Sequence, residues 1–284
     1  MNINMKRRSF LKTTAMTGAA LSLGINRSLK ASAELPIGIQ LYTVREKSSQ
    51  DFQGTLTKVA EIGYKYFEFA GYGGMEAGEL NQFLGELGVQ VCGTHEGYDN
   101  FLKDADKVIE FNQGIGSPYI IVPYMPQHVQ QGGVNAVERF ADNLNKFGYK
   151  AQQAGMQLCY HNHSFEFKKI DGERTIWDVL FSTADAGMVK AEMDVAWVYA
   201  ADIDPVQLMD TWGDRVKLLH MKDLDESGTL APVGEGVIDM PAVVEKAEQI
   251  GVEWYIVEQD RTRDNKDILD EIEISYKNMV KLLS

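Results

Sequence analysis

Cysteine is scarce in this sequence, which has only two among its 284 residues, Cys92 and Cys159. A disulfide framework needs more cysteines than this, and it places them in loops rather than in apolar runs. Both cysteines stand inside short apolar segments that are typical of strands. We therefore expect two free thiols, buried in the core as small apolar side chains.

Long apolar runs are also missing. From Glu34 onward, no stretch approaches the roughly 18 consecutive apolar residues that a membrane-spanning helix needs. Apolar residues nevertheless make up 44% of the chain, which is enough for a large core. No linker, low-complexity stretch or short repeat divides the sequence. Length and composition together predict a single α/β domain, and we expect no membrane insertion of the mature protein.

Positive charge is in short supply, because 28 basic residues face 41 acidic ones and give a net charge of −13. Six of the basic residues, and no acidic residue, fall within residues 1–33. Loss of that segment would leave 22 basic residues against 41 acidic ones, a net charge of −19. Such a surface repels phosphate backbones and anionic lipids, so we expect neither nucleic acid nor a membrane surface as a partner.

The N-terminus has three features that follow one another in order. Twin arginines precede Phe-Leu-Lys in Lys6-Arg7-Arg8-Ser9-Phe10-Leu11-Lys12, a mildly apolar stretch runs from Thr13 to Ile25, and Ala31-Ser32-Ala33 has the small-x-small form of a cleavage site. Together they resemble a bacterial twin-arginine (Tat) signal peptide. The resemblance implies export through the Tat machinery to the periplasm, with cleavage after Ala33 and a mature domain of residues 34–284. A basic arm or a membrane helix is the alternative interpretation.

Short apolar runs alternate with longer amphipathic ones after Glu34. The short runs are rich in β-branched and aromatic residues, as buried parallel strands are. The expected strands are Ile37–Val44, Tyr66–Ala70, Val89–Thr94, Tyr119–Val122, Gln157–His163, Val189–Val195, Val216–Met221 and Trp254–Glu258. Eight strands alternating with about eight helices over roughly 250 residues are typical of a (β/α)8 TIM barrel. The competing doubly wound sheet needs a glycine-rich phosphate turn after the first strand, and Ile39–Val44 contains none.

The longer runs show the three-to-four-residue apolar spacing of helices. They cover Phe52–Ile62, Glu79–Leu87, Ala136–Ala154 and Met240–Ile250, and a last helix is expected near Asp267–Leu283. A glycine ends each of the first four helices just before a strand, namely Gly63, Gly88, Gly155 and Gly251. Glycine at this position is the expected C-terminal cap.

Titratable side chains cluster at the carboxyl ends of the predicted strands, where the active-site groups of such barrels project. The ends of strands three, five, six, seven and eight carry Thr94-His95-Glu96, His161-Asn162-His163 followed by Glu166, Glu192-Met193-Asp194, His220-Met221-Lys222-Asp223 and Glu258-Gln259-Asp260-Arg261. Only one of the five histidines, His128, lies elsewhere. One such residue alone is commonly a helix cap or a hydrogen-bonded core group. Imidazoles and carboxylates from successive strands instead indicate a site for one divalent ion, Mn²⁺, Co²⁺, Zn²⁺ or Fe²⁺.

The layout resembles the xylose-isomerase-like barrel superfamily of sugar isomerases, epimerases and related dehydratases. The opening Ile37–Val44 is similar to the first strand of that superfamily, and Pro232–Gly236 is similar to its loop after strand seven. The likeness extends over about residues 36–283. Members bind a metal through one residue on each of strands five to eight, usually Glu, Asp, His and Glu. The resemblance implies that Asp194, His220 and Glu258 are metal ligands and that Arg261 faces the substrate.

Strand five departs from this pattern. Epimerases of the family carry there a glutamate that serves as both ligand and base, and the corresponding position holds His161. Imidazole still binds a metal, so His161 is the expected fourth ligand, ahead of His163 and Glu166. Its unperturbed pKa, near 6.5 rather than about 4, makes it a different base. Tyr-His-Asn-His is closer to the 2-keto-myo-inositol dehydratase branch, and Glu166 is a candidate to replace the lost carboxylate.

Trp197 marks a second departure, because epimerases often place a substrate-binding histidine three residues after the strand-six aspartate. A tryptophan offers an apolar face on which a sugar ring can stack. Ordinary packing at the rim of the barrel is the alternative. Together with His95, Lys222 and Arg261, Trp197 is expected to bind the substrate.

These features predict a metal-dependent isomerase or epimerase that removes a proton alpha to a carbonyl of a small, unphosphorylated sugar or keto-sugar. The acid/base candidates are Glu258, Glu166 and His163. The close alternative is a lyase or dehydratase that carries out β-elimination on a keto-sugar, keto-glycoside or keto-inositol. A sugar-binding protein without catalysis is disfavoured by the metal ligands, and a nuclease is disfavoured by the net charge. The sequence leaves the oligomeric state open, a homo-oligomer included.

Overall fold

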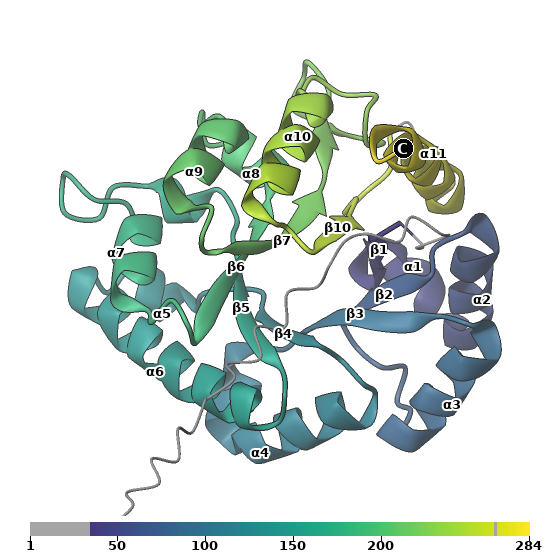
Figure 1. Ribbon diagram of the computed structural model, residues 1–284, viewed down its shortest axis with the longest axis horizontal. Coiled ribbons are helices and arrows are strands. Elements are labelled where there is room, and N and C mark those ends of the chain that lie inside the picture. Colours follow the sequence, from purple (N-terminus) through teal and green to yellow (C-terminus); the bar gives the residue numbers. More distant parts are fainter. Residues whose placement is uncertain (1–34, 264–265) are drawn as a thin grey trace, which may run out of the picture. The chain divides into compact units, whose positions relative to one another are not determined.

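Eight parallel strands close into a barrel, in the order β1-β10-β7-β6-β5-β4-β3-β2 (Figure 1). The structure is a computed structural model that describes residues 35–263 and 266–284. The predicted signal segment, residues 1–33, therefore lies outside the described residues. The barrel strands are β1 (Ile37–Gln40), β2 (Tyr66–Phe69), β3 (Gln90–His95), β4 (Tyr119–Val122), β5 (Gln157–His161), β6 (Val189–Asp194), β7 (Val216–Met221) and β10 (Trp254–Val257). This architecture confirms the predicted (β/α)8 barrel.

Helices surround the barrel on its outer side (Figure 1). They are α1 (Arg45–Ser48), α2 (Phe52–Ile62), α3 (Ala77–Leu87), α4 (Tyr98–Gly114), α5 (Gln127–Gln130), α6 (Val134–Gln153), α7 (Ile176–Thr183), α8 (Val195–Tyr199), α9 (Pro205–Trp212), α10 (Met240–Ile250) and α11 (Ile268–Leu282). The helices α2 and α10 have the predicted bounds. Helix α4 is not among the predicted helices. Its backbone leaves helical geometry at Asp104, with φ −163° and ψ 83°, so the helix is kinked there.

Glycines end the helices where the sequence places them. The backbone φ angles of Gly63, Gly88, Gly155 and Gly251 are +128°, +65°, +80° and +77°. Other residues rarely adopt such angles, because a Cβ atom would collide with the neighbouring carbonyl group. Each of these glycines therefore lets the chain turn from a helix into the next barrel strand.

The first and fifth strands are shorter than predicted, and both differences bear on the site. After Gln40 the chain turns into the 3-10 helix η1 (Leu41–Val44), whose first turn is capped by the Gln40 side chain at 2.8 Å from the backbone N–H of Tyr42. Strand β5 ends at His161, so Asn162 and His163 belong to the following loop. An apolar, β-branched run alone does not show where such a turn begins.

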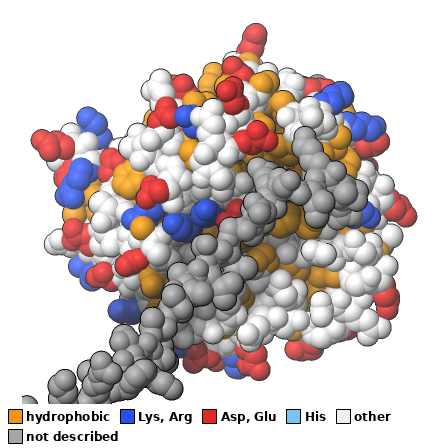
Figure 2. Space-filling view, in the orientation of Figure 1, with side chains coloured by type: hydrophobic (Ala, Val, Ile, Leu, Met, Phe, Trp, Pro, Cys, Tyr) orange, Lys and Arg blue, Asp and Glu red, His pale blue; other side chains and the backbone are white. Residues whose placement is uncertain are grey.

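The lower part of the barrel interior is an apolar layer. It consists of Cys92, Tyr119, Ile121, Cys159, Leu218 and Ile256, all buried, and we call it the lower layer. Both cysteines are free and buried, as the sequence predicts. No helix among the described residues is long and apolar enough to span a bilayer. On the face drawn in Figure 2, acidic and basic side chains lie interspersed on the surface.

Candidate active site

Titratable side chains fill the upper part of the barrel interior, above the lower layer, and they form two groups. The mouth cluster consists of Asp194, Lys222, Glu258 and Asp260. The inner cluster consists of Glu68, His95, His161, Glu192 and His220. Residues two apart on a strand face the same side. That spacing brings Glu192 and Asp194 from β6 and His220 and Lys222 from the end of β7 into one interior.

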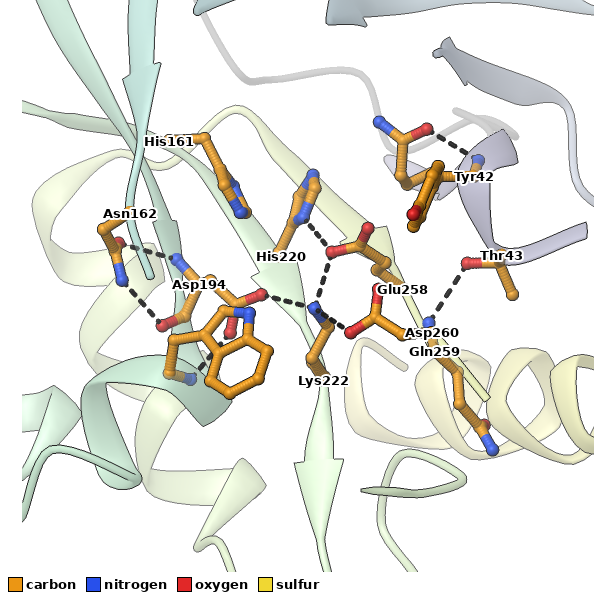
Figure 3. Close-up of polar contacts among 12 residues, drawn as sticks. Tyr42, Thr43, His161, Asn162, Asp194, His220, Lys222, Glu258, Gln259 and Asp260 are labelled. Carbon is orange, nitrogen blue, oxygen red and sulfur yellow. Dashed lines mark hydrogen bonds and ion pairs between the residues drawn. The ribbon is translucent and has the colours of Figure 1, made fainter. Parts of the chain in front are cut away.

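A buried lysine holds the mouth cluster together. Its ammonium Nζ lies 3.0 Å from Asp194 Oδ2, 2.8 Å from Glu258 Oε2 and 3.1 Å from Asp260 Oδ2 (Figure 3). Burial alone would lower the pKa of Lys222, but the three carboxylates outweigh it and hold the pKa above its usual value. The lysine is therefore a permanent cation at this point. Asp194 also caps α8, because its Oδ1 accepts the backbone N–H of Trp197 at 2.8 Å.

Two carboxylates and three imidazoles meet in the inner cluster. Glu192 Oε2 lies 2.8 Å from His95 Nε2, 3.0 Å from His220 Nε2 and 3.1 Å from His161 Nδ1. Glu68 Oε2 lies 2.7 Å from His220 Nε2 and 3.2 Å from His95 Nε2. His220 also connects the two clusters, because its Nδ1 is 2.8 Å from Glu258 Oε2.

The carboxylates of the inner cluster determine the charge of its imidazoles. Burial lowers the pKa of His95, but the charges of Glu68 and Glu192 outweigh this effect and raise it to about 9. The pKa of His220 is raised for the same reason, with Glu258 adding to it. His161 behaves in the opposite way, because burial and then the charge of His220 lower its pKa. Despite burial, the charges of His95 and His220 in turn lower the pKa of Glu68, whereas burial and the charge of Glu68 raise the pKa of Glu192.

Two sets of donors could hold a metal ion. One set is His161, Asp194, His220 and Glu258, the ligands predicted from the sequence; the other is His95, His161, Glu192 and His220. Within each set, all donor atoms lie within 4.8 Å of one another. Imidazole nitrogen and carboxylate oxygen suit Zn²⁺, Fe²⁺, Co²⁺ and Mn²⁺. Either set therefore fits the predicted divalent ion.

A cavity of about 330 Å³ opens above these groups. Its lining residues are Tyr42, Ala70, His95, Pro123, Tyr124, His161, His163, Lys222, Glu258 and Asp260. A second cavity, of about 700 Å³, shares Asp260 with it and is lined by Trp197 and Arg261, among others. Of the predicted substrate-binding residues, His95 and Lys222 thus face the first cavity. Trp197 and Arg261 face the second.

His163 and Glu166 follow strand β5 and lie in different surroundings. His163 lines the first cavity, its Nδ1 has no hydrogen-bond partner among the described residues, and burial lowers its pKa to about 4. Glu166, in the 3-10 helix η2 (Phe165–Phe167), is fully buried. Its carboxylate accepts the Tyr160 hydroxyl at 2.7 Å and the backbone N–H of His163 at 2.9 Å. Glu166 lines neither cavity, and it supports the His163 loop instead.

Glu68, Glu192 and Asp260 also take part in the site. The strand-end pattern includes Glu192 and Asp260 but assigns them no role, and it does not include Glu68. Glu192 lies two residues before Asp194 on the same strand, and Asp260 lies two residues after Glu258. The period of two would therefore have placed both on the face of a predicted ligand. Glu68 is the one charged residue in the buried strand Tyr66–Phe69. The only indication of this role in the sequence is that a single carboxylate stands inside an apolar run.

The loop after β7 is fixed to the strand that carries His220 and Lys222. It contains a two-stranded hairpin, β8 (Asp223–Leu224) and β9 (Leu230–Ala231). The Asp223 carboxylate accepts the backbone N–H groups of Leu224 and Gly234 at 2.9 Å, of Gly236 at 3.0 Å and of Ile238 at 3.3 Å. We call these four hydrogen bonds the Asp223 clamp.

Comparison with known proteins gives matches along most of the chain. The sequence model of the family described as xylose isomerase-like TIM barrel matches residues 56–278, and that of the twin-arginine translocation signal matches residues 4–24, which supports export. An inosose dehydratase of Lacticaseibacillus casei is 27% identical over 143 residues, which are 44% of this chain and 47% of that protein. The chain thus spans about half the length of this relative. An inosose dehydratase of Geobacillus kaustophilus is 22% identical over 246 residues, 72% of this chain and 79% of that protein.

Solved structures share the fold. A sugar phosphate isomerase/epimerase from Parabacteroides distasonis superposes with a TM-score of 0.77 at 24% identity, and the match covers 89% of this chain and 98% of that one. A structure described as the IOLI protein with a bound zinc atom superposes with a TM-score of 0.67 at 14% identity, covering 88% and 98%.

Proposed function

Because the chain belongs to the xylose isomerase-like TIM barrel family, we propose that it is a metal-dependent enzyme acting on a small, unphosphorylated keto-sugar or keto-inositol. The reaction begins with removal of a proton alpha to the carbonyl group. It ends with loss of a β-substituent, as in a dehydratase or lyase. The relatives described as inosose dehydratases support this choice over an isomerase or epimerase.

The metal would be held at the floor of the first cavity by ligands that include His161 and His220, the residues common to both donor sets. When bound, it polarises the substrate carbonyl and stabilises the negative charge that develops on the oxygen. Either Asp194 and Glu258, as the sequence predicts, or His95 and Glu192 would complete the coordination. The identity of the ion is likewise part of the proposal.

Lysine, histidine and carboxylate side chains have distinct roles in this reaction. The Lys222 ammonium faces the cavity as a permanent cation, so it can hold a substrate hydroxyl or the developing oxyanion. His163 is a neutral imidazole at neutral pH because burial lowers its pKa, and it can accept the proton from carbon. Glu258 stays ionised beside Lys222 and His220, and it can accept or return a proton on the metal side of the cavity.

One observation favours elimination over inversion. Inversion at carbon needs two bases on opposite faces of the substrate, and Glu166 was the carboxylate expected to supply the second. Its oxygens are engaged by Tyr160 and by the backbone of His163, away from the cavity. A proton removed by one base, with departure of the β-substituent, needs no second carboxylate.

An epimerase or isomerase remains the second candidate. His163 and Glu258 both line the first cavity, so one imidazole and one carboxylate could serve opposite faces of a bound sugar. The structural neighbour described as a sugar phosphate isomerase/epimerase has the same fold.

Turnover in D₂O separates the two reactions. The purified protein is incubated with 2-keto-myo-inositol and a panel of keto-sugars, and the products are followed by NMR and mass spectrometry. We expect a product lighter by one water, with no accumulation of an epimer. An epimer that carries solvent deuterium at the inverted carbon, without loss of water, would instead establish the second candidate.

Two variants test the roles of the residues after β5. His163→Gln should lower turnover by about 10²- to 10⁴-fold, the range for loss of a general base. Glu166→Gln is the matched control, and its turnover should stay within a few-fold of the wild type. Equal turnover of wild type and His163→Gln would remove His163 from the reaction.

We also propose that the mature protein begins at Glu34 in the periplasm. Sequencing the N-terminus of the exported protein tests this boundary. Recovery of periplasmic protein that still carries residues 1–33 would contradict it.

A further inference from the structure

We propose that the divalent ion binds to His95, His161, Glu192 and His220 of the inner cluster, and not to the ligand set that the family pattern implies. This inference rests on the proposed function and specifies its metal site. The two sets share His161 and His220. The question is therefore whether Glu192 and His95, or Asp194 and Glu258, complete the coordination.

The spacing of the inner donors fits one ion. Glu192 Oε2 has three imidazole nitrogens around it, at 2.8, 3.0 and 3.1 Å. Ligands about 2.1 Å from a tetrahedrally coordinated metal are separated by roughly 3.4 Å. The four donor atoms lie within 4.8 Å of one another, so a single ion can contact all of them.

The orientation of His220 supports the same assignment. Its Nδ1 lies 2.8 Å from Glu258 Oε2, and its Nε2 points to Glu68 and Glu192. A metal-bound histidine characteristically donates its other ring N–H to a carboxylate, which fixes the ring and its tautomer. With Nδ1–H donated to Glu258, the lone pair of Nε2 faces the inner cluster. Glu258 is then a partner of a ligand and remains free for proton transfer.

Charge distinguishes the two sets as well. Asp194 and Glu258 already share the ammonium of Lys222, at 3.0 and 2.8 Å. Glu68 and Glu192 are fully buried, and no lysine or arginine in residues 35–263 and 266–284 forms an ion pair with either of them. Two buried carboxylates without a fixed cation are costly, and one divalent ion neutralises both.

Unused donor atoms point to the same place. Glu192 Oε1 is buried with no hydrogen-bond partner among the described residues, so it is available as a second oxygen ligand. Glu68 Oε2 is 2.7 Å from His220 Nε2 and is held by Gln40 Nε2 at 2.6 Å, beside the proposed ion. His95 and His161 line the first cavity, so an ion between them is accessible to a substrate.

The donor types also limit the metal. Three imidazoles and one or two carboxylates select zinc, iron, cobalt or nickel over magnesium and calcium, which prefer all-oxygen sites. The substrate would meet the ion at the cavity floor, with the Lys222 ammonium and the Glu258 carboxylate above it.

Metal binding measured without turnover tests the assignment. Wild type and isosteric variants are stripped with a chelator and titrated with Co²⁺, and binding is followed by visible absorption and by elemental analysis. Glu192→Gln should weaken Co²⁺ binding by at least about 100-fold, and Asp194→Asn should stay within about threefold of the wild type. Asp194→Asn is the matched control, because asparagine keeps the oxygen that caps α8. His95→Gln gives a second inner variant at a partly exposed position, in case Glu192→Gln fails to fold.

Each outcome is decisive. Loss of binding in Asp194→Asn with retention in Glu192→Gln and His95→Gln overturns the inner assignment but leaves the proposed function intact. An equal loss of Co²⁺ binding in all three variants would place the ion between the two sets of donors, and it would also overturn the inner assignment. A wild type that binds no divalent ion would instead contradict the metal dependence of the proposed function.

Discussion

The two halves of the barrel interior come from the same strands but have opposite chemistry. On β5, β7 and β10, an apolar residue of the lower layer is followed two residues later by a titratable one: Cys159 by His161, Leu218 by His220, and Ile256 by Glu258. Two residues are about 6.6 Å along a parallel strand. Chemistry therefore begins one side-chain layer above a packed core, and that core holds the reactive groups in place.

A glycine on β3 marks the boundary between the two halves. A Cβ atom at Gly93 would lie 2.8 Å from Glu68 Oε1 and 2.9 Å from the Ile121 side chain. Glu68 belongs to the inner cluster and Ile121 to the lower layer, so the boundary has no room for a further side chain. We therefore predict that mutations above this boundary change function and that mutations below it change stability.

The largest effect is expected above the boundary, at Glu258. Glu258→Gln keeps the shape of the side chain but removes the charge that contacts Lys222 and His220. Turnover should fall by about 10²- to 10⁴-fold, as for the loss of an acid/base group. The free energy of unfolding should change far less. Steady-state kinetics and urea unfolding of the same preparation measure both quantities. A variant that loses stability but keeps its turnover would contradict this division between the two halves of the barrel.

The converse change lies below the boundary, at Leu218. Leu218→Ala opens a cavity in the fully buried lower layer and should lower the free energy of unfolding by about 2–5 kcal/mol. Turnover per folded molecule should remain close to that of the wild type, because the residue touches neither cavity. Chemical denaturation and active-site titration with Co²⁺ provide the two readouts. A loss of metal affinity larger than the loss of stability would show that the two halves are coupled.

The smallest effect is expected at Glu166, a titratable residue that is fully buried. Burial raises its pKa to about 8, above the value of about 4.3 for an unfolded chain. Between these pH values the folded protein keeps a proton that the unfolded chain has released, so stability falls as the pH rises toward about 8. Glu166→Gln removes this dependence, and its stability relative to the wild type should increase from pH 5 to pH 8. Urea unfolding of both proteins at several pH values measures the difference. If their free energies of unfolding change with pH in parallel, Glu166 is ionised in the folded protein.

The sequence predicted the barrel because its signals are local. Gly63, Gly88, Gly155 and Gly251 each take a backbone angle that glycine tolerates best, and β-branched runs between them form the strands. These features depend on neighbours a few residues away. The strand positions that carry His161, Asp194, His220 and Glu258 could be identified for the same reason.

What the sequence could not show depends on directions in space. Glu166 turns away from the cavity because the η2 turn directs it to Tyr160, and no spacing rule specifies that turn. Glu68 joins the site through contact with His220, 152 residues away along the chain. The ion pairs of Lys222 with Asp194 and Glu258, two of the predicted metal ligands, likewise become visible only when the distances are known.

The Asp223 clamp has a consequence for the timing of catalysis. Four backbone amides of the loop after β7 bind one carboxylate next to Lys222, so this loop moves with the strand and does not open as a lid. At the mouth of the first cavity, Tyr42 and Tyr124 are about half exposed, at 45% and 48%, and we expect substrate exchange to depend on them. Rotation of two aromatic side chains on a fixed frame is a fast event. If the chain carries out the reaction that we propose, product release should be quick compared with the breaking of the carbon–hydrogen bond.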